Sequence, residues 1–437
     1  MTVSVSTRSR SWRSVFVLVA AVALCLGACQ DDASDAPAGK PANKSADRAT
    51  VPSIAWSLPE TSAVTPVRIE ETEAVAAARA SLESIVRTYA RDPDNPWAIC
   101  HAILALGTET KLTNGENAID YLFGTYAQVK VVDGQSLVFF PLQKKRTIMD
   151  PSTGEAKTVD VFVEAHPELV LKALAERGAK PDRVVAVGGE EYTLAHLYRH
   201  CLHRSWVLGG RLGVMHWNNV AWGMRALATW APSDLAWSAD GRSMTLDGYA
   251  HQGLLNLLQV TAPQHRVMAG GKAPGEPKPG LDAYTCGGAH YVSGIGYALG
   301  RGFGQKGDRE KFREVIDLVF WSYPRRLELL SRVEKKHPKM KSLVTQQRFK
   351  FIGHFIELTH KLAAIGMFEP SDAEKQLMRS SVEDLVNLVA RLEKVELHKH
   401  LPAIRKRDEQ RYLDYVGDSA HALHGLNLAT GHVRVAH

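Results

Sequence analysis

One short segment of this sequence offers the clearest chemistry. Cys286 and His290 are four positions apart, the spacing that brings two side chains onto one face of a helix. A thiolate and an imidazole are both ligands that Zn²⁺ accepts in a tetrahedral site. Tyr297 follows about two turns later on the same face and could exchange a proton with a bound molecule. Cys286 and His290 are therefore candidate metal ligands, and His290 and Tyr297 are candidate acid–base residues.

The helix that must position these side chains is expected to begin at Gly287 and Gly288, after a loop rich in proline, glycine and lysine between 263 and 280. On the polar face of this helix, Gly294 lies between His290 and Tyr297. We expect it to leave a gap, as in a helix that lines a cavity. A second face carries small residues, which would let another helix approach closely: Ala289, Ser293, Gly296 and Gly300.

A second set of candidate acid–base residues lies near the C-terminus. Asp418, His421 and His424 recur at intervals of three and so share one arc of the last predicted helix. Histidine titrates near neutral pH and can move protons beside a carboxylate. We expect this arc to face the interior, which adds Asp418 and His424 to the candidate catalytic residues.

A third group of titratable residues leads to a different interpretation. His354, Glu357 and His360 share the polar arc of a helix whose other side is apolar. That pattern is typical of a surface helix with one solvated face. We therefore predict that these three side chains face solvent; the alternative is that they flank a cavity and move protons.

The other cysteines leave two accounts of Cys286 open. Cys100 and Cys201 also have histidines beside them, but adjacent residues on a helix point about 100° apart and cannot easily share one ion. The three cysteines could hold zinc in part, through Cys286 and His290. They could equally be small buried side chains, two of them joined as a disulfide in an oxidising compartment.

The N-terminus has the features of a secretory signal. Three arginines within residues 8–13 precede an apolar stretch at 15–24, which is too short to span a bilayer. Leu26-Gly27-Ala28-Cys29 then resembles the lipobox of bacterial lipoproteins. The resemblance implies cleavage before Cys29, acylation of Cys29 with palmitate-type chains, and anchoring to a membrane of the bacterial cell envelope, either in the outer membrane or facing the periplasm. The alternative is an ordinary secretory signal that happens to contain a cysteine.

Composition divides the chain into three parts. Residues 1–28 form the signal peptide, and residues 29–66 have too few apolar side chains to fold, which predicts a flexible lipidated tether. Residues 67–437 are expected to form a single domain. Removal of residues 1–28 takes away three arginines and no acidic residue, so the net charge falls from +6 to +3. Such a modest charge outside the cytoplasm argues against a nucleic-acid partner.

Helical spacing dominates residues 67–437, with short strands expected in a small irregular or β-containing insertion near 129–190. Sequential helix pairs without a fixed repeat favour a closed α/α barrel over an open solenoid. Thr285-Cys286-Gly287-Gly288, leading into a helix of small residues, resembles the start of an inner helix in α/α toroids. That class includes terpenoid cyclases, protein prenyltransferases and lanthionine cyclases. The resemblance implies a mainly α toroid around one central cavity.

The catalytic motifs of that class do not occur in this sequence. Cys100-His101 is followed by Ala102 where the lanthionine cyclases have glycine, and neither a DxDD motif nor an Asp-x-Cys pair is present. Two functions therefore stay open. The domain binds a small molecule or an envelope protein in its cavity. Alternatively, it is an enzyme that uses acid–base residues or a Cys/His zinc site, with His290, Tyr297, Asp418, His424 and Cys286 as its residues.

Overall fold

The computed structural model describes residues 53–62, 65, 67–149, 155–164, 166–207, 214–239, 242–270 and 280–435. The predicted signal peptide, Cys29 and the tether up to residue 52 lie outside these ranges. The described residues form 13 α-helices and four two-stranded antiparallel sheets. The expectation of a mainly helical fold with a few short strands is therefore confirmed.

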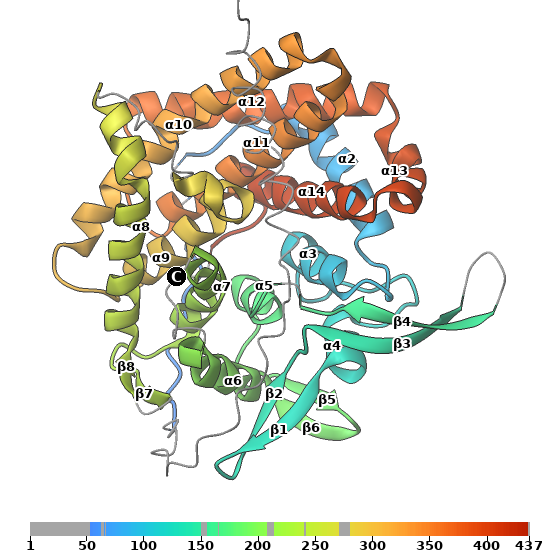
Figure 1. Cartoon of the computed structure of the whole chain (residues 1–437), viewed down its shortest axis with the longest axis vertical. Coiled ribbons are helices and arrows are strands. Elements are labelled where there is room, and N and C mark those ends of the chain that lie inside the picture. Colours follow the sequence, from blue (N-terminus) through green and yellow to red (C-terminus); the bar gives the residue numbers. More distant parts are fainter. Residues whose placement is uncertain are drawn as a thin grey trace, which may run out of the picture.

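Six helices occupy the middle of the molecule (Figure 1). Each packs against the next member of the set in chain order, and the last packs against the first, so the series returns to its starting point. The six are α3 (Pro96–Leu106), α5 (Leu169–Glu176), α7 (Val214–Trp230), α9 (Ala289–Gly300), α11 (Lys341–Ala364) and α14 (Glu409–Thr430).

Contacts between neighbours in this set advance in the same direction along both helices. On α7 and α9, the ring of Trp222 lies 4.1 Å from that of His290, and further along both helices the guanidinium of Arg225 lies over the ring of Tyr297. Helices whose contacts advance together run parallel. The same order relates α5 to α7 (Lys172 to Trp222, then Glu176 to Arg225), α9 to α11 (His290 to His354, then Gly300 to Ile365), α11 to α14 (Gln346 to Asp414, then Glu357 to His424) and α14 to α3 (Gly417 to Trp97, then His421 to His101).

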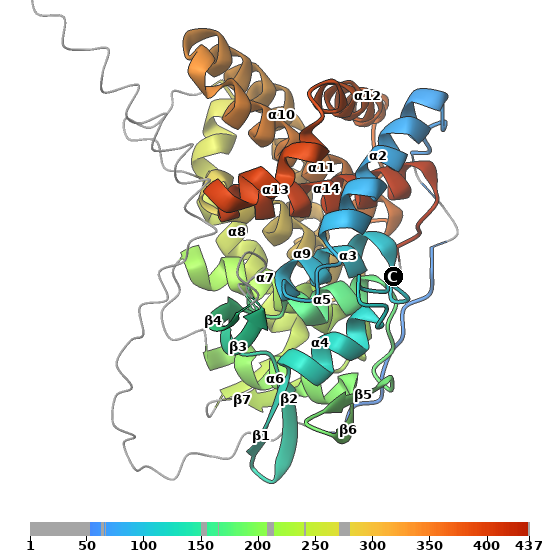
Figure 2. The same cartoon turned by 90° about the vertical axis from the view of Figure 1, so that its right-hand side faces the viewer.

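The remaining helices lie further from the middle, and at least one of them precedes each of the six in the chain (Figures 1 and 2). One of them shows why such a helix forms. A capping box between Ser371 and Glu374 begins the helix of residues 372–394, whose buried face is a stripe of Met378, Val382, Leu385 and Val389. The outer helices are α2 (Glu73–Tyr89), α4 (Ala118–Tyr126), α6 (Leu194–Val207), α8 (Leu246–Met268), α10 (Asp308–Lys336), α12 (Asp372–Lys394) and α13 (Leu397–Arg407).

The strands form hairpins at the ends of helices. Asp133 and Gly134, both with positive φ, close the first hairpin in the two-residue turn that suits antiparallel strands. Three hairpins fall within or beside the predicted 129–190 region, but α5 of the inner set lies there too, so the region is not only an insertion. A fourth hairpin was not expected. The pairs are β1 (Gln128–Val132) with β2 (Gln135–Phe139), β3 (Gln143–Met149) with β4 (Ala156–Phe162), β5 (Val184–Val187) with β6 (Glu190–Thr193), and β7 (Ala236–Ala239) with β8 (Arg242–Thr245).

The glycines of α9 allow close packing on two sides. A methyl group added at Gly296 would lie 2.6 Å from Phe312 and 2.8 Å from Leu362, so the prediction that the small-residue face contacts other helices is confirmed. The prediction for Gly294 is wrong. A Cβ atom at this position would collide with the backbone carbonyl oxygen of Ala221 on α7. Gly294 therefore closes α9 onto α7 and leaves no gap between the polar side chains.

The packed part of the chain begins before residue 67. Ile54 is buried, and the Ser57 amide donates to the carbonyl of Trp230 at 3.1 Å. Ordered contacts therefore start inside the range assigned to the tether. One hydrophobic core joins residues from Ile54 to Val435. None of the helices in the described ranges combines the length and the apolar run needed to cross a membrane.

Candidate functional site

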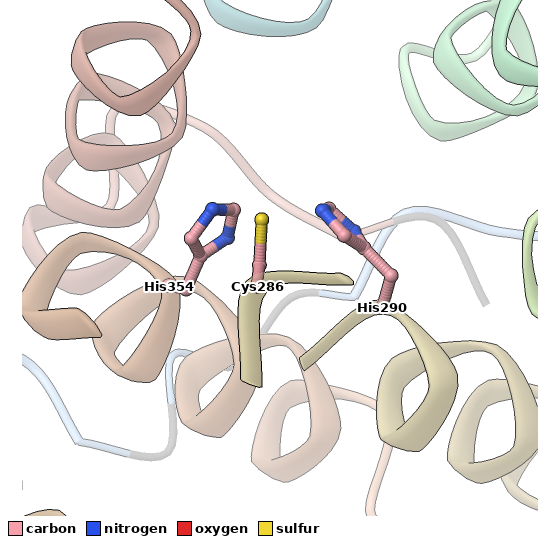
Figure 3. A group of neighbouring side chains, drawn as sticks. All are labelled: Cys286, His290 and His354. Carbon is pink, nitrogen blue, oxygen red and sulfur yellow. The ribbon is translucent and has the colours of Figure 1, made fainter. Parts of the chain in front are cut away.

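Three side chains with metal-ligating atoms meet where α9 begins. Figure 3 shows the sulfur of Cys286 between the imidazole rings of His290 and His354. One donor atom from each residue lies within 4.8 Å of the other two. Cys286 belongs to the short 3₁₀ segment η3 (Thr285–Gly288), His290 to the first turn of α9, and His354 to the middle of α11. The structure thus adds His354 to the predicted Cys286–His290 pair.

An unusual backbone turn presents the thiol of Cys286. Cys286, Gly287 and Gly288 have φ values of 54°, 65° and 81°, so three successive residues are left-handed. Glycine tolerates this conformation, whereas it costs a residue with a Cβ about 1–2 kcal/mol. α9 starts only at Ala289. Cys286 and His290 therefore meet because the chain turns before the helix, and not because they share one helical face as the spacing predicted.

Both imidazoles of this cluster are buried and neutral near pH 7. Burial lowers the pKa of His354 to about 3 and that of His290 well below its usual value. Neither nitrogen of His354 has a hydrogen-bond partner. Its Nδ1 lies 3.8 Å from a carboxylate oxygen of Glu357, and its Nε2 lies 3.7 Å from one of Asp418. Each nitrogen thus has a carboxylate nearby at a distance too long for a hydrogen bond.

A small cavity reaches this cluster from the surface. It has a volume of about 30 Å³, and Cys286 and His354 are the metal-ligating residues in its wall. That is room for an ion or a molecule of only a few atoms, and it is less than a drug-sized ligand occupies. The other walls are mainly apolar side chains of α9, α10 and α11, with Arg326 bonded to Asp282 at 2.7 Å. The cavity therefore lies beside α10 and not on the axis of the six inner helices.

The space between the inner helices holds a dense network of ion pairs. Glu357 accepts hydrogen bonds of 2.7 Å from His421, His424 and Lys361. Lys361 also bonds Glu176 at 2.8 Å. Two further cations approach Glu176, namely Lys172 at 3.3 Å and Arg225 at 3.2 Å. We refer to these seven residues as the ion-paired centre.

The charges in the ion-paired centre compensate one another. Burial alone would raise the pKa of Glu357, but Lys361 and the two histidines bring it well below its usual value. The pKa of Glu176 is likewise lowered by its cations in spite of burial. Burial lowers the pKa values of His421 and His424 to about 4. Ionised carboxylates thus face cations and neutral imidazoles.

The four predicted catalytic residues fall into two groups. His290 joins Cys286 and His354, and Asp418 lies beside His354 with its pKa raised to about 6 by burial. Tyr297 lies under the guanidinium of Arg225, and His424 bonds Glu357. Tyr297 and His424 therefore belong with the ion-paired centre, a full turn or more further along the inner helices.

The prediction that His354, Glu357 and His360 face solvent is wrong. His354, Glu357 and His360 are only 2%, 4% and 2% exposed, respectively. A signal for their burial was present in the sequence. α11 and α14 carry matching polar stripes, and Gly353 and Gly425 lie where their backbones touch. The stripe on α11 consists of Gln346, Lys350, His354, Glu357 and Lys361, and that on α14 of Gln410, Asp414, Asp418 and His421.

None of Cys100, Cys201 and Cys286 forms a disulfide. Cys100 and Cys201 are 1% exposed and pack in the hydrophobic core, and burial raises the pKa of each thiol. The account of buried small side chains therefore fits these two. Cys286 differs from both, because it is only partly buried and borders the cavity.

Comparison of this chain with protein-family models, with curated proteins and with solved structures gives no significant match.

Proposed function

We propose that this protein is a cell-envelope lipoprotein whose helical domain binds a small ligand or an envelope partner at the Cys286 cavity. The lipobox-like Leu26-Gly27-Ala28-Cys29 supports the anchor. The observation that carries the binding site is the cavity itself, whose wall includes the thiol of Cys286 and the buried imidazole of His354, a ring whose two nitrogens lack hydrogen-bond partners.

We also propose that the domain is an α/α toroid. Six parallel helices that contact one another in turn and return to the first support this arrangement, as does the alternation of inner and outer helices along the chain. In such a domain the inner helices present their N-terminal ends on one side. The Cys286 cavity, at the start of α9, belongs to that side.

Lipidation is tested by metabolic labelling with palmitate. The wild-type protein should take up label and remain with the membrane fraction, whereas Cys29→Ser should do neither. Cys25→Ser is the matched control, since Cys25 lies within the predicted signal and outside the lipobox. Equal labelling of the Cys29→Ser variant would contradict the anchor.

Ligand binding is tested on the full chain purified from membranes in detergent. Ala289 borders the cavity, so Ala289→Phe should fill it. Mass spectrometry of the denatured protein should detect a small molecule released by the wild type and not by Ala289→Phe. Ala403→Phe on the exposed side of α13 serves as control. Identical spectra for the wild type and Ala289→Phe would contradict a binding role for the cavity.

An enzyme is the second candidate function, and one observation favours it. Asp418 is buried beside His354 with a pKa raised to about 6, which suits a group that gives and takes protons near neutral pH. Tyr297 and His424 are less suited, because both are engaged in the ion-paired centre.

A further inference from the structure

We propose that Cys286, His290 and His354 bind one Zn²⁺ ion through the thiolate and two neutral imidazoles, with a fourth coordination position open to the cavity. This inference rests on the proposed binding role of that cavity and adds that a zinc ion is bound at its wall. The three donors come from η3, α9 and α11 (Figure 3). The ion would therefore join two neighbouring helices of the inner set.

The donor atoms are close to the geometry that zinc needs. Zinc lies about 2.3 Å from sulfur and about 2.0–2.1 Å from imidazole nitrogen, which places tetrahedral ligand atoms roughly 3.3–3.7 Å apart. The three donors here lie within 4.8 Å of one another. Closure around an ion thus requires side-chain movements on the order of 1 Å. The left-handed turn at Cys286 already directs the sulfur between the two rings.

His354 provides the independent sign of a missing ligand. A buried polar group without a hydrogen bond costs free energy, and His354 has two such atoms in one ring that is 2% exposed. A metal ion would satisfy the nitrogen that faces Cys286. The other nitrogen would then donate a hydrogen bond to the carboxylate beside it. For Nδ1 that carboxylate is Glu357, now 3.8 Å away, and for Nε2 it is Asp418, now 3.7 Å away, so either bond needs only a modest shortening. Such a second carboxylate is what orients metal-binding histidines in proteins.

Charge selects this cluster over two others with similar spacing. His354, Glu357 and His421 could in principle hold a cation, as could Glu176, Glu357 and His424. In both, the carboxylates already bond ammonium or guanidinium groups in the ion-paired centre. A divalent ion would have to displace those cations from buried positions. The Cys286 cluster has no carboxylate among its three donors, so an ion bound there would not compete with buried cations for one.

The coordination predicted here is that of a zinc site that binds a fourth ligand. Structural zinc sites have four protein ligands, whereas three protein ligands leave a position for water or a small molecule. The cavity of about 30 Å³ beside Cys286 and His354 has room for that water. When bound, the ion would lower the pKa of the water and polarise a small substrate or ligand.

The first test is the metal content of the full-length protein, purified from membranes in detergent without chelator. Elemental analysis should find about one zinc per chain. Cys286→Ser and His354→Gln should each lose most of it. His360→Gln is the matched control, since His360 lies on the same helix, is equally buried and also has two unpartnered nitrogens. Retention of zinc in Cys286→Ser, or its absence from the wild type, would overturn the proposal.

The second test identifies the ligands and guards against misfolding. Cobalt exchanged into the wild type should give the absorption of a tetrahedral site with a sulfur-to-metal charge-transfer band. Cys286→Ser should lose that band while its far-ultraviolet circular dichroism stays unchanged, and Cys100→Ser should keep the band. Copper or iron in place of zinc would overturn the identity of the ion, and an unchanged band in Cys286→Ser would overturn the site.

The outcomes also separate this inference from the proposed function. Ala289→Phe fills the cavity but leaves all three ligands in place, so it should retain zinc and lose only the small molecule. Cys286→Ser should lose zinc. A wild type that carries a small molecule sensitive to Ala289→Phe but no metal would contradict the zinc site alone. A wild type with zinc but no such molecule would contradict the binding role alone.

Discussion

Two buried clusters share α11 and differ in how their polar atoms are satisfied. In the ion-paired centre, Glu176 and Glu357 meet Lys361, Lys172 and Arg225 at 2.7–3.3 Å. At the Cys286 cluster, one or two turns earlier on the same helix, both nitrogens of His354 lack partners. Burial of titratable groups therefore does not by itself mark a functional site. The atoms left without partners beside a cavity distinguish the second cluster from the first.

The largest effect is expected from breaking the ion-paired centre. Glu176→Gln would leave Lys172, Arg225 and Lys361 with one carboxylate fewer in a buried environment. The free energy of unfolding should fall by about 3–5 kcal/mol, as when one partner of a buried ion pair is removed. Urea denaturation of the soluble Cys29→Ser protein measures this loss. Glu328→Gln removes an exposed ion pair with Arg332 and is the control; a similar loss in both variants would contradict the comparison.

Overpacking between α9 and its neighbours should have the next largest effect. A side chain at Gly296 would collide with Phe312 and Leu362, so Gly296→Leu should lower the free energy of unfolding by about 1–3 kcal/mol. A methyl group added at Gly124 on α4 would meet no atom within 4 Å. Gly124→Leu should therefore be tolerated, and thermal unfolding of the two variants compares them directly. Equal stability would contradict the close approach at Gly296.

The ion-paired centre should also make stability depend on pH. Burial lowers the pKa of His424 to about 4 in the folded state, while the unfolded chain takes up a proton near 6.5. A lowered folded pKa gives stability that is complete above pH 6.5 and is lost as the pH falls toward 4. His424→Gln should reduce the slope of unfolding free energy in that window by up to about 1.4 kcal/mol per pH unit. An unchanged slope would show that His424 is not buried as a neutral ring.

The smallest effect on stability is expected at the Cys286 cluster. Serine has nearly the size of cysteine, and Cys286 is only partly buried. In the presence of a chelator, Cys286→Ser should therefore change the free energy of unfolding by no more than about 0.5 kcal/mol. Addition of zinc should then stabilise the wild type and not the variant, because only a state that binds the ion gains from it. A large loss with chelator present would assign Cys286 to the core.

Local features of the chain were predictable because they depend on neighbours in sequence. The apolar spacing predicted the helices, and short strands were expected near 129–190. The small residues of α9 predicted its close contacts. Cys286 and His290 were expected together, and they are, although the left-handed turn and not a shared helical face brings them there.

What the sequence determined by itself was the helical character of the domain, the small-residue face of α9 and the proximity of Cys286 to His290, all of which follow from interactions within a few residues. Only the tertiary structure decided that His354 joins them and that Glu357 is buried. A polar stripe on one helix looks the same whether it faces water or a second polar stripe. The parallel pairing of α11 with α14 removes that ambiguity, because it buries both stripes and leaves the two nitrogens of His354 without hydrogen-bond partners.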